Sequence, residues 1–356
     1  MKNNNIKQKK SQDHMKENND RKRKNRRFFE MIKKKLSKKM RKYVESCSTF
    51  MMFYADVTLE KRKLMNANSC KNRFCPFCSY RKARKEGLKI SILMKKLDLD
   101  QNYEFLFLTL TAPNVPGEEL ENEIKSYAAA FNRFVLFKEF QKINLGYIRK
   151  LEITYNSEKN TYHPHYHLIL CVNKNYFTSR DYIKQKKWLE MWQLAKRDMT
   201  ITQVDVRKAD KNSFLEIAKY AAKDSDYLLN QNVFDVFYKS LKGKKILTYN
   251  RIFKDLSKEY DDGKLDYLKD VDTTDYIYKL VFQWLGNEYK EIIFENLSEE
   301  EKNKMKNILI DEIDIEKNGT KLTKIKYKKE IKNTMKPTKK RKLNIIKSID
   351  KPTKKS

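Results

Sequence analysis

Three short apolar runs in the middle of the chain predict strands. Residues 104–111 read EFLFLTLT and stop at Ala112-Pro113-Asn114, which is typical of a buried strand that ends in a turn. Residues 146–155 and 166–172 are two further runs rich in β-branched and aromatic side chains, separated by the polar segment 156–161. These two runs therefore predict an antiparallel hairpin.

Helical patterns flank the predicted strands. Residues 122–137 have a helical pattern, and residues 181–199 place Ile183, Trp188, Met191, Trp192 and Ala195 on one stripe. Residues 201–206 return to a strand, and a second helix is expected from Ser213. The sequence thus predicts an α+β fold over residues 100–230, with a central antiparallel sheet flanked by helices.

Charge divides the rest of the chain. Lys and Arg number 79 against 47 Asp and Glu, so the net charge is +32 and the expected partner is a polyanion, above all nucleic acid. Residues 1–42 hold 18 basic and 4 acidic residues, and residues 317–356 hold 16 and 2. Both ends are predicted to be basic disordered arms that bind phosphate backbones. For residues 21–27, a nuclear address or a solubilising run stays open as an alternative.

The remaining segments complete the predicted domain organisation. Residues 43–99 are expected to form a small Cys-rich zinc-knuckle module with a basic helix. Residues 231–316 are expected to form a helical C-terminal module, because residues 251–316 are acidic and mostly helical in pattern, with a capped helix starting at Ser298. No apolar run approaches the roughly 18 residues of a membrane span, and the N-terminus lacks the apolar core of a signal sequence. We therefore expect a cytoplasmic protein without a membrane partner.

Four of the five cysteines are spaced like metal ligands. Cys47, Cys70, Cys75 and Cys78 include a Cys-Pro-Phe-Cys pair of the kind found in zinc knuckles, where four thiolates close a tetrahedral site. In a reducing compartment such cysteines are better explained as ligands of structural Zn²⁺ than as disulfides. A set of unliganded thiols is the alternative. The lone Cys171 lies in an apolar strand and is expected to be a core residue.

Basic side chains crowd this cysteine segment and suggest a metal-fixed basic surface. The candidates for DNA contact there are Arg73, Arg81, Lys82 and Arg84.

Three of the four histidines fall within five residues, in the sequence His163-Pro164-His165-Tyr166-His167. On a strand, His165 and His167 share a face and lie about 7 Å apart. A carboxylate from a neighbouring strand would complete an open divalent-metal site, and Glu152 is the expected third ligand, provided that the hairpin register turns it to the same face. His163 stays open as a rival third ligand, and a histidine strand that binds nothing is the alternative.

A helix beginning at Ser213 carries a further candidate group. Glu216 and Tyr220 are at positions i and i+4 and share a face, and Lys219 and Lys223 flank them. A tyrosine near cations and a metal ion can serve as a nucleophile toward phosphorus. Taken singly, Glu216 could be a helix cap and Tyr220 a packing residue.

The order of these motifs resembles a known family. Phe107-Leu108-Thr109-Leu110-Thr111, His163-Pro164-His165-Tyr166-His167, and Glu216 with Tyr220 and Lys223 are similar to the three motifs of rolling-circle plasmid replication initiators in the HUH endonuclease superfamily. The preceding Cys70–Cys78 segment resembles the cysteine motif of initiators with one catalytic tyrosine. The resemblance covers roughly residues 45–230.

The resemblance implies a reaction and a set of roles. His165, His167 and a carboxylate such as Glu152 would hold Mg²⁺ or Mn²⁺, and Tyr220 would cut the origin strand as a 5′-phosphotyrosine. Glu216 would activate water to end the reaction, Lys223 would steady phosphate charge, and Thr109, Thr111 and Lys219 become further DNA-contact candidates. The order of histidine strand before tyrosine favours an initiator over a relaxase.

Partners and alternatives follow from the same resemblance. Single-stranded or hairpin plasmid origin DNA in a bacterial cytoplasm is the implied substrate, with a host helicase and a replication polymerase as further partners. Residues 251–316 are candidates for homodimer formation or for contact with a host protein. An HUH transposase or relaxase and a non-catalytic, zinc-dependent DNA-binding regulator remain the competing hypotheses.

Overall fold

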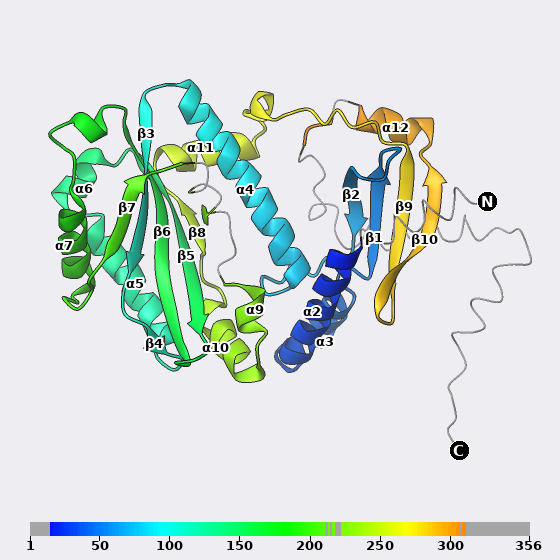
Figure 1. Ribbon diagram of the computed structural model, residues 1–356, viewed down its shortest axis with the longest axis horizontal. Helices are drawn as coiled ribbons and strands as arrows, with labels where there is room; N and C mark the ends of the chain where they lie inside the picture. The colour runs from blue at the N-terminus through cyan, green and yellow to red at the C-terminus, as the bar shows by residue number, and fades with distance from the viewer. Residues whose placement is uncertain (1–14, 211–212, 214–215, 218–221, 307, 311–356) are drawn as a thin grey trace, which may run out of the picture.

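Two antiparallel sheets joined by the long helix α4 (Pro76–Leu99) make up the computed structural model (Figure 1). The structure describes residues 15–210, 213, 216–217, 222–306 and 308–310. The α+β class and the antiparallel sheet flanked by helices are confirmed. No helix among these described residues combines the length and the apolar character that crossing a membrane requires.

The larger sheet has the strand order β7-β3-β6-β5-β8, and the short strand β4 pairs with β6. The predicted hairpin is present as β5 and β6, with Glu152 opposite His165 and Lys150 opposite His167. Strand β3 lies on the other side of β6 and places Thr109 opposite His167. The strands are Tyr103–Thr111 (β3), Val115–Pro116 (β4), Gly146–Asn156 (β5), Thr161–Asn173 (β6), Val204–Lys208 (β7) and Leu247–Tyr249 (β8).

Side chains alternate between two apolar layers on this sheet. Tyr166 and Leu168 on β6 face a core shared with helices α5 (Leu120–Phe134) and α7 (Gln185–Lys196), and α6 (Lys138–Ile143) packs on the same side. Ile169 and Cys171 face the opposite core, which α4 and α11 (Ile252–Asp261) cover. The prediction that Cys171 is a core residue is confirmed, since it is fully buried there.

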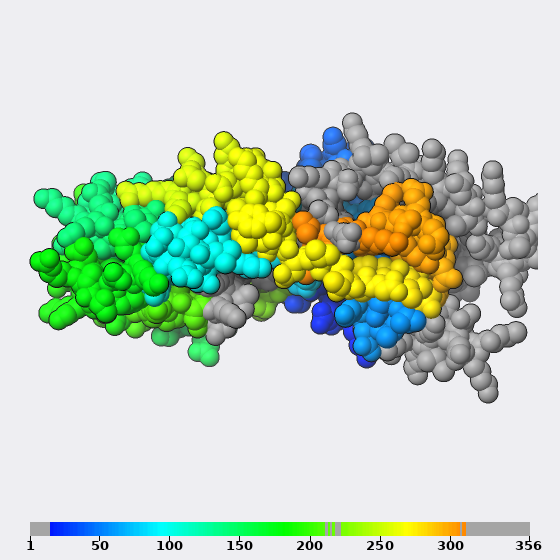
Figure 2. Space-filling view, turned by 90° about the horizontal axis from the view of Figure 1, so that it is seen from above, coloured from blue at the N-terminus to red at the C-terminus, as the bar shows by residue number. Residues whose placement is uncertain are grey.

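The smaller sheet has the order β10-β9-β1-β2, so its strands come from both ends of the described chain. Met51 on β1 pairs with Ala67 on β2 and with Phe282 on β9. The strands are Phe50–Ala55 (β1), Arg62–Ala67 (β2), Tyr278–Leu285 (β9) and Glu288–Asn296 (β10). After α11 the chain passes along α4, where Lys95 Nζ donates to Leu268 O at 2.9 Å, and then enters β9 (Figure 2).

Shorter elements complete the molecule. Phe74, just before α4, packs against Phe234 on α10 (Gln231–Leu241) and Tyr227 on α9 (Asp224–Tyr227), with ring centroids 5.9 and 5.7 Å apart. These contacts attach the segment before α4 to helices α9 and α10. These elements are η1 (Lys33–Lys35), α3 (Lys38–Glu45), η2 (Tyr176–Thr178), α9 (Asp224–Tyr227), α10 (Gln231–Leu241), η3 (Asp266–Leu268) and α12 (Glu299–Met305).

The prediction of a disordered basic arm over residues 1–42 is wrong for residues 16–42. Residues Lys16–Ile32 form helix α2, and α3 follows it. Phe28 and Ile32 are fully buried, and Phe28 contacts Phe234 from far along the chain. The few apolar residues of this segment share one face, so tertiary packing orders a helix that its charge alone would not favour. Residues 1–14 and the predicted tail 317–356 lie outside the described residues.

The acidic C-terminal segment contains strands where helices were expected. Residues 278–296 form the β9–β10 hairpin, which pairs with β1. Its turn is Gly286-Asn287, with Gly286 at φ +70°, a conformation that glycine adopts without strain. The predicted helix at Ser298 is confirmed as α12, which starts with a capping box between Ser298 and Glu301.

Candidate functional site

Glu152, His165 and His167 converge on one face of the larger sheet. Their ligand atoms all lie within 4.8 Å of one another, and all three side chains are largely buried. His167 Nε2 is 3.5 Å from Glu152 Oε2. The β5–β6 register turns Glu152 toward the histidines, as the hairpin predicts. His163 lies outside this trio, although its ring is tilted against that of His165 at a centroid distance of 5.2 Å, so the geometry favours Glu152 as the third ligand.

Neighbouring polar groups orient the two imidazoles. His165 Nδ1 donates to His163 O at 3.2 Å, which leaves the Nε2 lone pair for a ligand. His167 Nδ1 is 3.2 Å from Thr109 Oγ1, and Phe107 stacks on the ring. Thr109, one of the DNA-contact candidates, therefore contacts and orients His167. Thr111, the other candidate on β3, donates from Oγ1 to Gln203 O at 3.4 Å.

The electrostatics of the trio suit a divalent cation. Burial, and to a smaller extent the nearby His167, lower the pKa of His165 to about 4, so the ring is neutral near pH 7. Burial would raise the pKa of Glu152, but the hydrogen bond from His167 and the charge of Lys150 outweigh it and hold the pKa at about 2. One ionised carboxylate and a neutral imidazole thus face each other in a buried site.

Lys150 is a functional residue that the sequence analysis missed. Its side chain is buried, and Nζ lies 3.1 Å from Glu152 Oε2 and 3.0 Å from the backbone oxygen of Glu216. The lysine therefore joins the carboxylate of the trio to the helical residue Glu216. A cation two residues before Glu152 on the same strand face was the available signal.

The predicted nucleophile lies outside the described residues. Tyr220 and Lys219 both belong to the residues that the structure does not describe, so their positions stay predictions. Glu216 and Ser213 are helical, and Lys223 is exposed just before α9. Asp210 and Ser213 exchange hydrogen bonds, since Ser213 N donates to Asp210 Oδ1 at 2.8 Å and Asp210 N to Ser213 Oγ at 3.2 Å.

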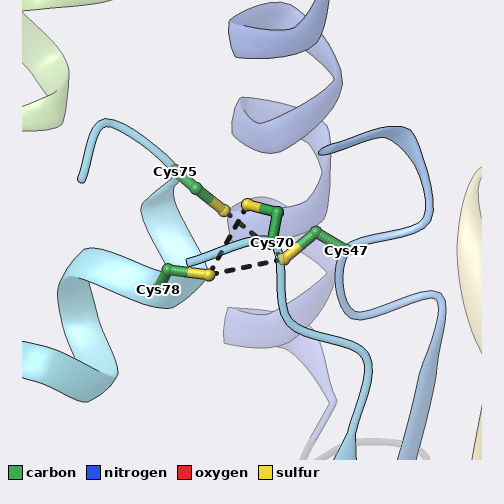
Figure 3. A group of neighbouring side chains, drawn as sticks. All are labelled: Cys47, Cys70, Cys75 and Cys78. Atoms are coloured by element: carbon green, nitrogen blue, oxygen red, sulfur yellow. Dashed lines mark hydrogen bonds between the residues drawn. The ribbon is translucent and has the colours of Figure 1, made fainter. Parts of the chain in front are cut away.

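Cys47, Cys70, Cys75 and Cys78 form a second cluster, with all four sulfurs within 4.8 Å of one another (Figure 3). Cys47 Sγ is 3.5 Å from Cys75 Sγ and 3.6 Å from Cys78 Sγ. A tetrahedral zinc site with Zn–S bonds of about 2.3 Å would separate its sulfurs by about 3.8 Å. All four thiols are buried, and Cys47, the ligand most distant in sequence, belongs to the group.

Two side chains of helix α2 form hydrogen bonds with this cysteine cluster. Asn25 Nδ2 donates to Cys75 Sγ at 3.3 Å, and the buried Lys22 Nζ donates to Asn25 Oδ1 at 2.9 Å and to Cys47 O. Ser69 Oγ is 3.4 Å from Cys78 Sγ. Burial lowers the pKa of Lys22, and the nearby cysteines offset only part of this shift. Lys22 and Asn25 were not predicted, because only the fold brings them to Cys47 and Cys75, which lie 25 and 50 positions further along the chain.

The basic residues of the cysteine segment divide into two groups. Arg73 Nη1 donates to Leu241 O at 2.7 Å and Lys244 O at 2.9 Å, and Arg81 Nη2 donates to Ser48 Oγ at 2.8 Å. Lys82 pairs with Glu86 at 3.7 Å, and Arg84 lies over the ring of Tyr80 at 5.9 Å. Arg73 and Arg81 thus hold the fold together, while Lys82 and Arg84 are exposed.

Both clusters lie largely within the part of the chain that matches a known protein family. Residues 61–292 match the family described as replication protein, a range that contains every ligand of both clusters except Cys47. A protein named rep from Staphylococcus aureus is 48% identical over 221 residues, covering 60% of this chain and 95% of that protein. Proteins named rep from a Bacillus species and from Streptococcus pneumoniae are each 33% identical, over 64% of this chain and 82% and 75% of their own lengths. No solved structure matches the chain. The chain therefore belongs to the replication protein family.

Proposed function

We propose that the protein initiates rolling-circle replication of a plasmid by nicking one strand of its origin. The observation that carries this proposal is the convergence of Glu152, His165 and His167 on one sheet face, next to the helical residue Glu216. Membership of the replication protein family supports it. Single-stranded or hairpin origin DNA is the proposed substrate, because the nucleophile must reach an unstacked phosphate.

The trio fits Mg²⁺ or Mn²⁺. A buried carboxylate with a low pKa and an imidazole that stays neutral near pH 7 offer oxygen and nitrogen lone pairs, and both histidines are oriented through their Nδ1 atoms. When bound, the ion would polarise the scissile phosphate and offset the charge that develops on it. Glu152, His165 and His167 would hold the ion, and Lys150 would fix the orientation of Glu152.

The proposed cleavage uses the tyrosine as the nucleophile. The phenolic oxygen of Tyr220 attacks phosphorus, the bond to the 3′ oxygen breaks, and a proton passes to that oxygen, which leaves a 5′-phosphotyrosine and a free 3′-OH. The 3′-OH primes synthesis by a host polymerase, with a host helicase opening the duplex. After one round, Glu216 activates a water molecule that hydrolyses a second linkage, and Lys223 steadies phosphate charge.

The cysteine cluster fits structural Zn²⁺. Four buried thiols at near-tetrahedral spacing, with a hydrogen bond from Asn25 to Cys75, match a closed site without an open ligand position. Binding there would contribute folding free energy and fix the start of α4 against α2. The role that we propose for this zinc is structural.

A covalent adduct tests the nuclease proposal. The purified protein is incubated with Mn²⁺ and labelled single strands that span a plasmid origin, and the adduct is mapped by peptide mass spectrometry. We expect an adduct on Tyr220 that is lost in Tyr220→Phe, while DNA binding is retained. Tyr267→Phe, at an exposed tyrosine on η3, is the matched control and should keep the adduct. Unchanged nicking by Tyr220→Phe would overturn the proposal.

A further inference from the structure

A cleft lies between the first turns of α4 and the connection from α10 to β8. Its volume is about 480 Å³, within the range of roughly 300–1,000 Å³ that ligand sites occupy. One wall comes from the cysteine segment and α4, including Phe74, Cys78 and Lys82. The other wall comes from residues 244–247. Neither the proposed cleavage step nor the proposed zinc role places a ligand in this space.

The walls of the cleft are strongly basic. Five cations line it, against the single carboxylate of Glu86, which pairs with Lys82. The five are Lys71, Arg73, Lys82, Lys244 and Lys245. Within the described part of the chain, Lys244 and Lys245 form no ion pair. A concentration of positive charge in a concave site attracts a polyanion more strongly than the same charges spread over a convex surface would.

The two walls are fixed relative to each other. The guanidinium of Arg73 spans one end of the cleft by donating to Leu241 O and Lys244 O. Cys78 anchors the α4 wall in the cysteine cluster. The lysines at 244 and 245 are therefore attached to a stiff frame, which lowers the cost of ordering them around a ligand.

The cleft adjoins the proposed nuclease site. Ala222, six residues after Glu216 in the sequence, is part of its lining. Leu247 of the cleft wall pairs across the sheet with Lys150, whose ammonium contacts Glu152. The cleft and the histidine trio are thus built on neighbouring strands, so a DNA single strand bound at the trio can extend into the cleft.

We propose that this cleft is a binding subsite for single-stranded DNA, in which Lys244 and Lys245 hold the phosphates on one side of the cleaved bond. The aliphatic side chains of Ile246 and Leu247 supply contact surface for the sugars. The position of the subsite relative to the cleaved bond rests on the proposed nicking function. Its affinity for single strands can be measured without cleavage.

The experiment compares Lys244→Ala/Lys245→Ala with Lys184→Ala/Lys186→Ala. The control pair removes the same charge from exposed positions at α7, which covers the opposite face of the sheet. Binding of a labelled origin single strand is followed by fluorescence anisotropy from 50 to 300 mM salt, without added Mg²⁺ or Mn²⁺. Each lost phosphate contact should reduce the slope of log Kd against log salt by about 0.7. We therefore expect a slope lower by about 1.4 for the cleft variant and an unchanged slope for the control.

Truncated oligonucleotides locate the subsite. Strands shortened stepwise from the 5′ or the 3′ side of the nick site are bound to the wild type and to the cleft variant. We expect the difference between the two proteins to vanish when shortening from one side only. The subsite would be overturned if the salt slope of the cleft variant equalled that of the wild type, or if the control variant changed by the same amount. It would also be overturned if the cleft variant and the wild type differed equally with every shortened strand. If the wild type forms no tyrosine adduct, the nicking proposal fails, while these binding measurements still decide the subsite.

Discussion

The ammonium of Lys150 lies 3.1 Å from the carboxylate of Glu152, and both side chains are buried. The same ammonium donates to the backbone oxygen of Glu216 at 3.0 Å. A buried ion pair contributes little net stability, because desolvation offsets the attraction between the charges. The pair instead fixes geometry, since one side chain holds the Glu152 carboxylate of the proposed metal site relative to Glu216, four residues before the proposed nucleophile.

Lys150→Met should reduce nicking without weakening metal binding. The substitution keeps the apolar stem and removes the charge, so Glu152 loses its orienting partner and Glu216 its hydrogen bond. Loss of such a supporting group typically costs about 10–100-fold in activity. Mn²⁺ should bind at least as tightly, because a cation that repels it is gone. Adduct formation rates and Mn²⁺ titration calorimetry on the same preparation measure the two effects separately.

Arg149→Met is the matched control for that variant. Arg149 is the preceding residue on β5, but its guanidinium lies on the opposite face, over Phe131 and Tyr166 at 4.3 and 4.5 Å. It should lower stability without changing the nicking rate of the folded protein. An unaltered nicking rate in Lys150→Met would show that Lys150 does not position Glu152 or Glu216 for cleavage.

The metal trio could be predicted from the sequence because a strand has a period of two. His165 and His167 share a face by geometry alone, and the polar segment 156–161 between two apolar runs predicts a hairpin that can bring Glu152 opposite them. The register that does so comes from the structure. The cysteine spacing likewise identified all four members of the second cluster. Both patterns are local, so a single sequence contains them.

Long-range pairing could not be predicted in this way. The strand β9 pairs with β1, which lies more than 200 residues earlier in the chain. The Gly286-Asn287 pair between apolar runs was a hairpin signal that the acidic composition obscured. Helix α2 was missed for a related reason, because the surface that buries Phe28 includes Phe234, from far along the chain.

Phe282→Ala should destabilise the protein markedly. Phe282 is fully buried on β9, pairs with Met51 of β1 and contacts the ring of Phe53 at 6.0 Å. Replacing a buried phenylalanine by alanine typically costs about 3–5 kcal/mol. Urea denaturation followed by circular dichroism measures the change. Ile292→Ala on β10, where the side chain is 37% exposed, should cost about 1 kcal/mol or less. Equal effects of the two variants would mean that β9 does not form part of the core.

Cys75→Ala should remove one equivalent of zinc and lower the thermal midpoint. Cys75 caps α4 and is fully buried, so its loss opens the site and leaves three thiols around an incomplete coordination shell. Metal analysis of the dialysed protein and a thermal melt with and without a chelator report the effect. Cys171→Ala removes a buried thiol outside the cluster and should keep the full zinc content. Equal zinc in Cys75→Ala and the wild type would exclude the cluster as the metal site.

Glu216→Ala should separate the two halves of the proposed reaction. The hydrogen bond from Lys150 goes to the backbone oxygen of Glu216, so truncation of the side chain leaves that link in place. Cleavage by Tyr220 should continue, whereas hydrolytic release should slow by about 10²–10⁴-fold, because a positioned carboxylate no longer activates water. A pulse-chase of the labelled adduct measures the release. Glu300→Ala, at an exposed position on α12, should release DNA at the wild-type rate. Release from Glu216→Ala at that same rate would assign the hydrolytic step to another group.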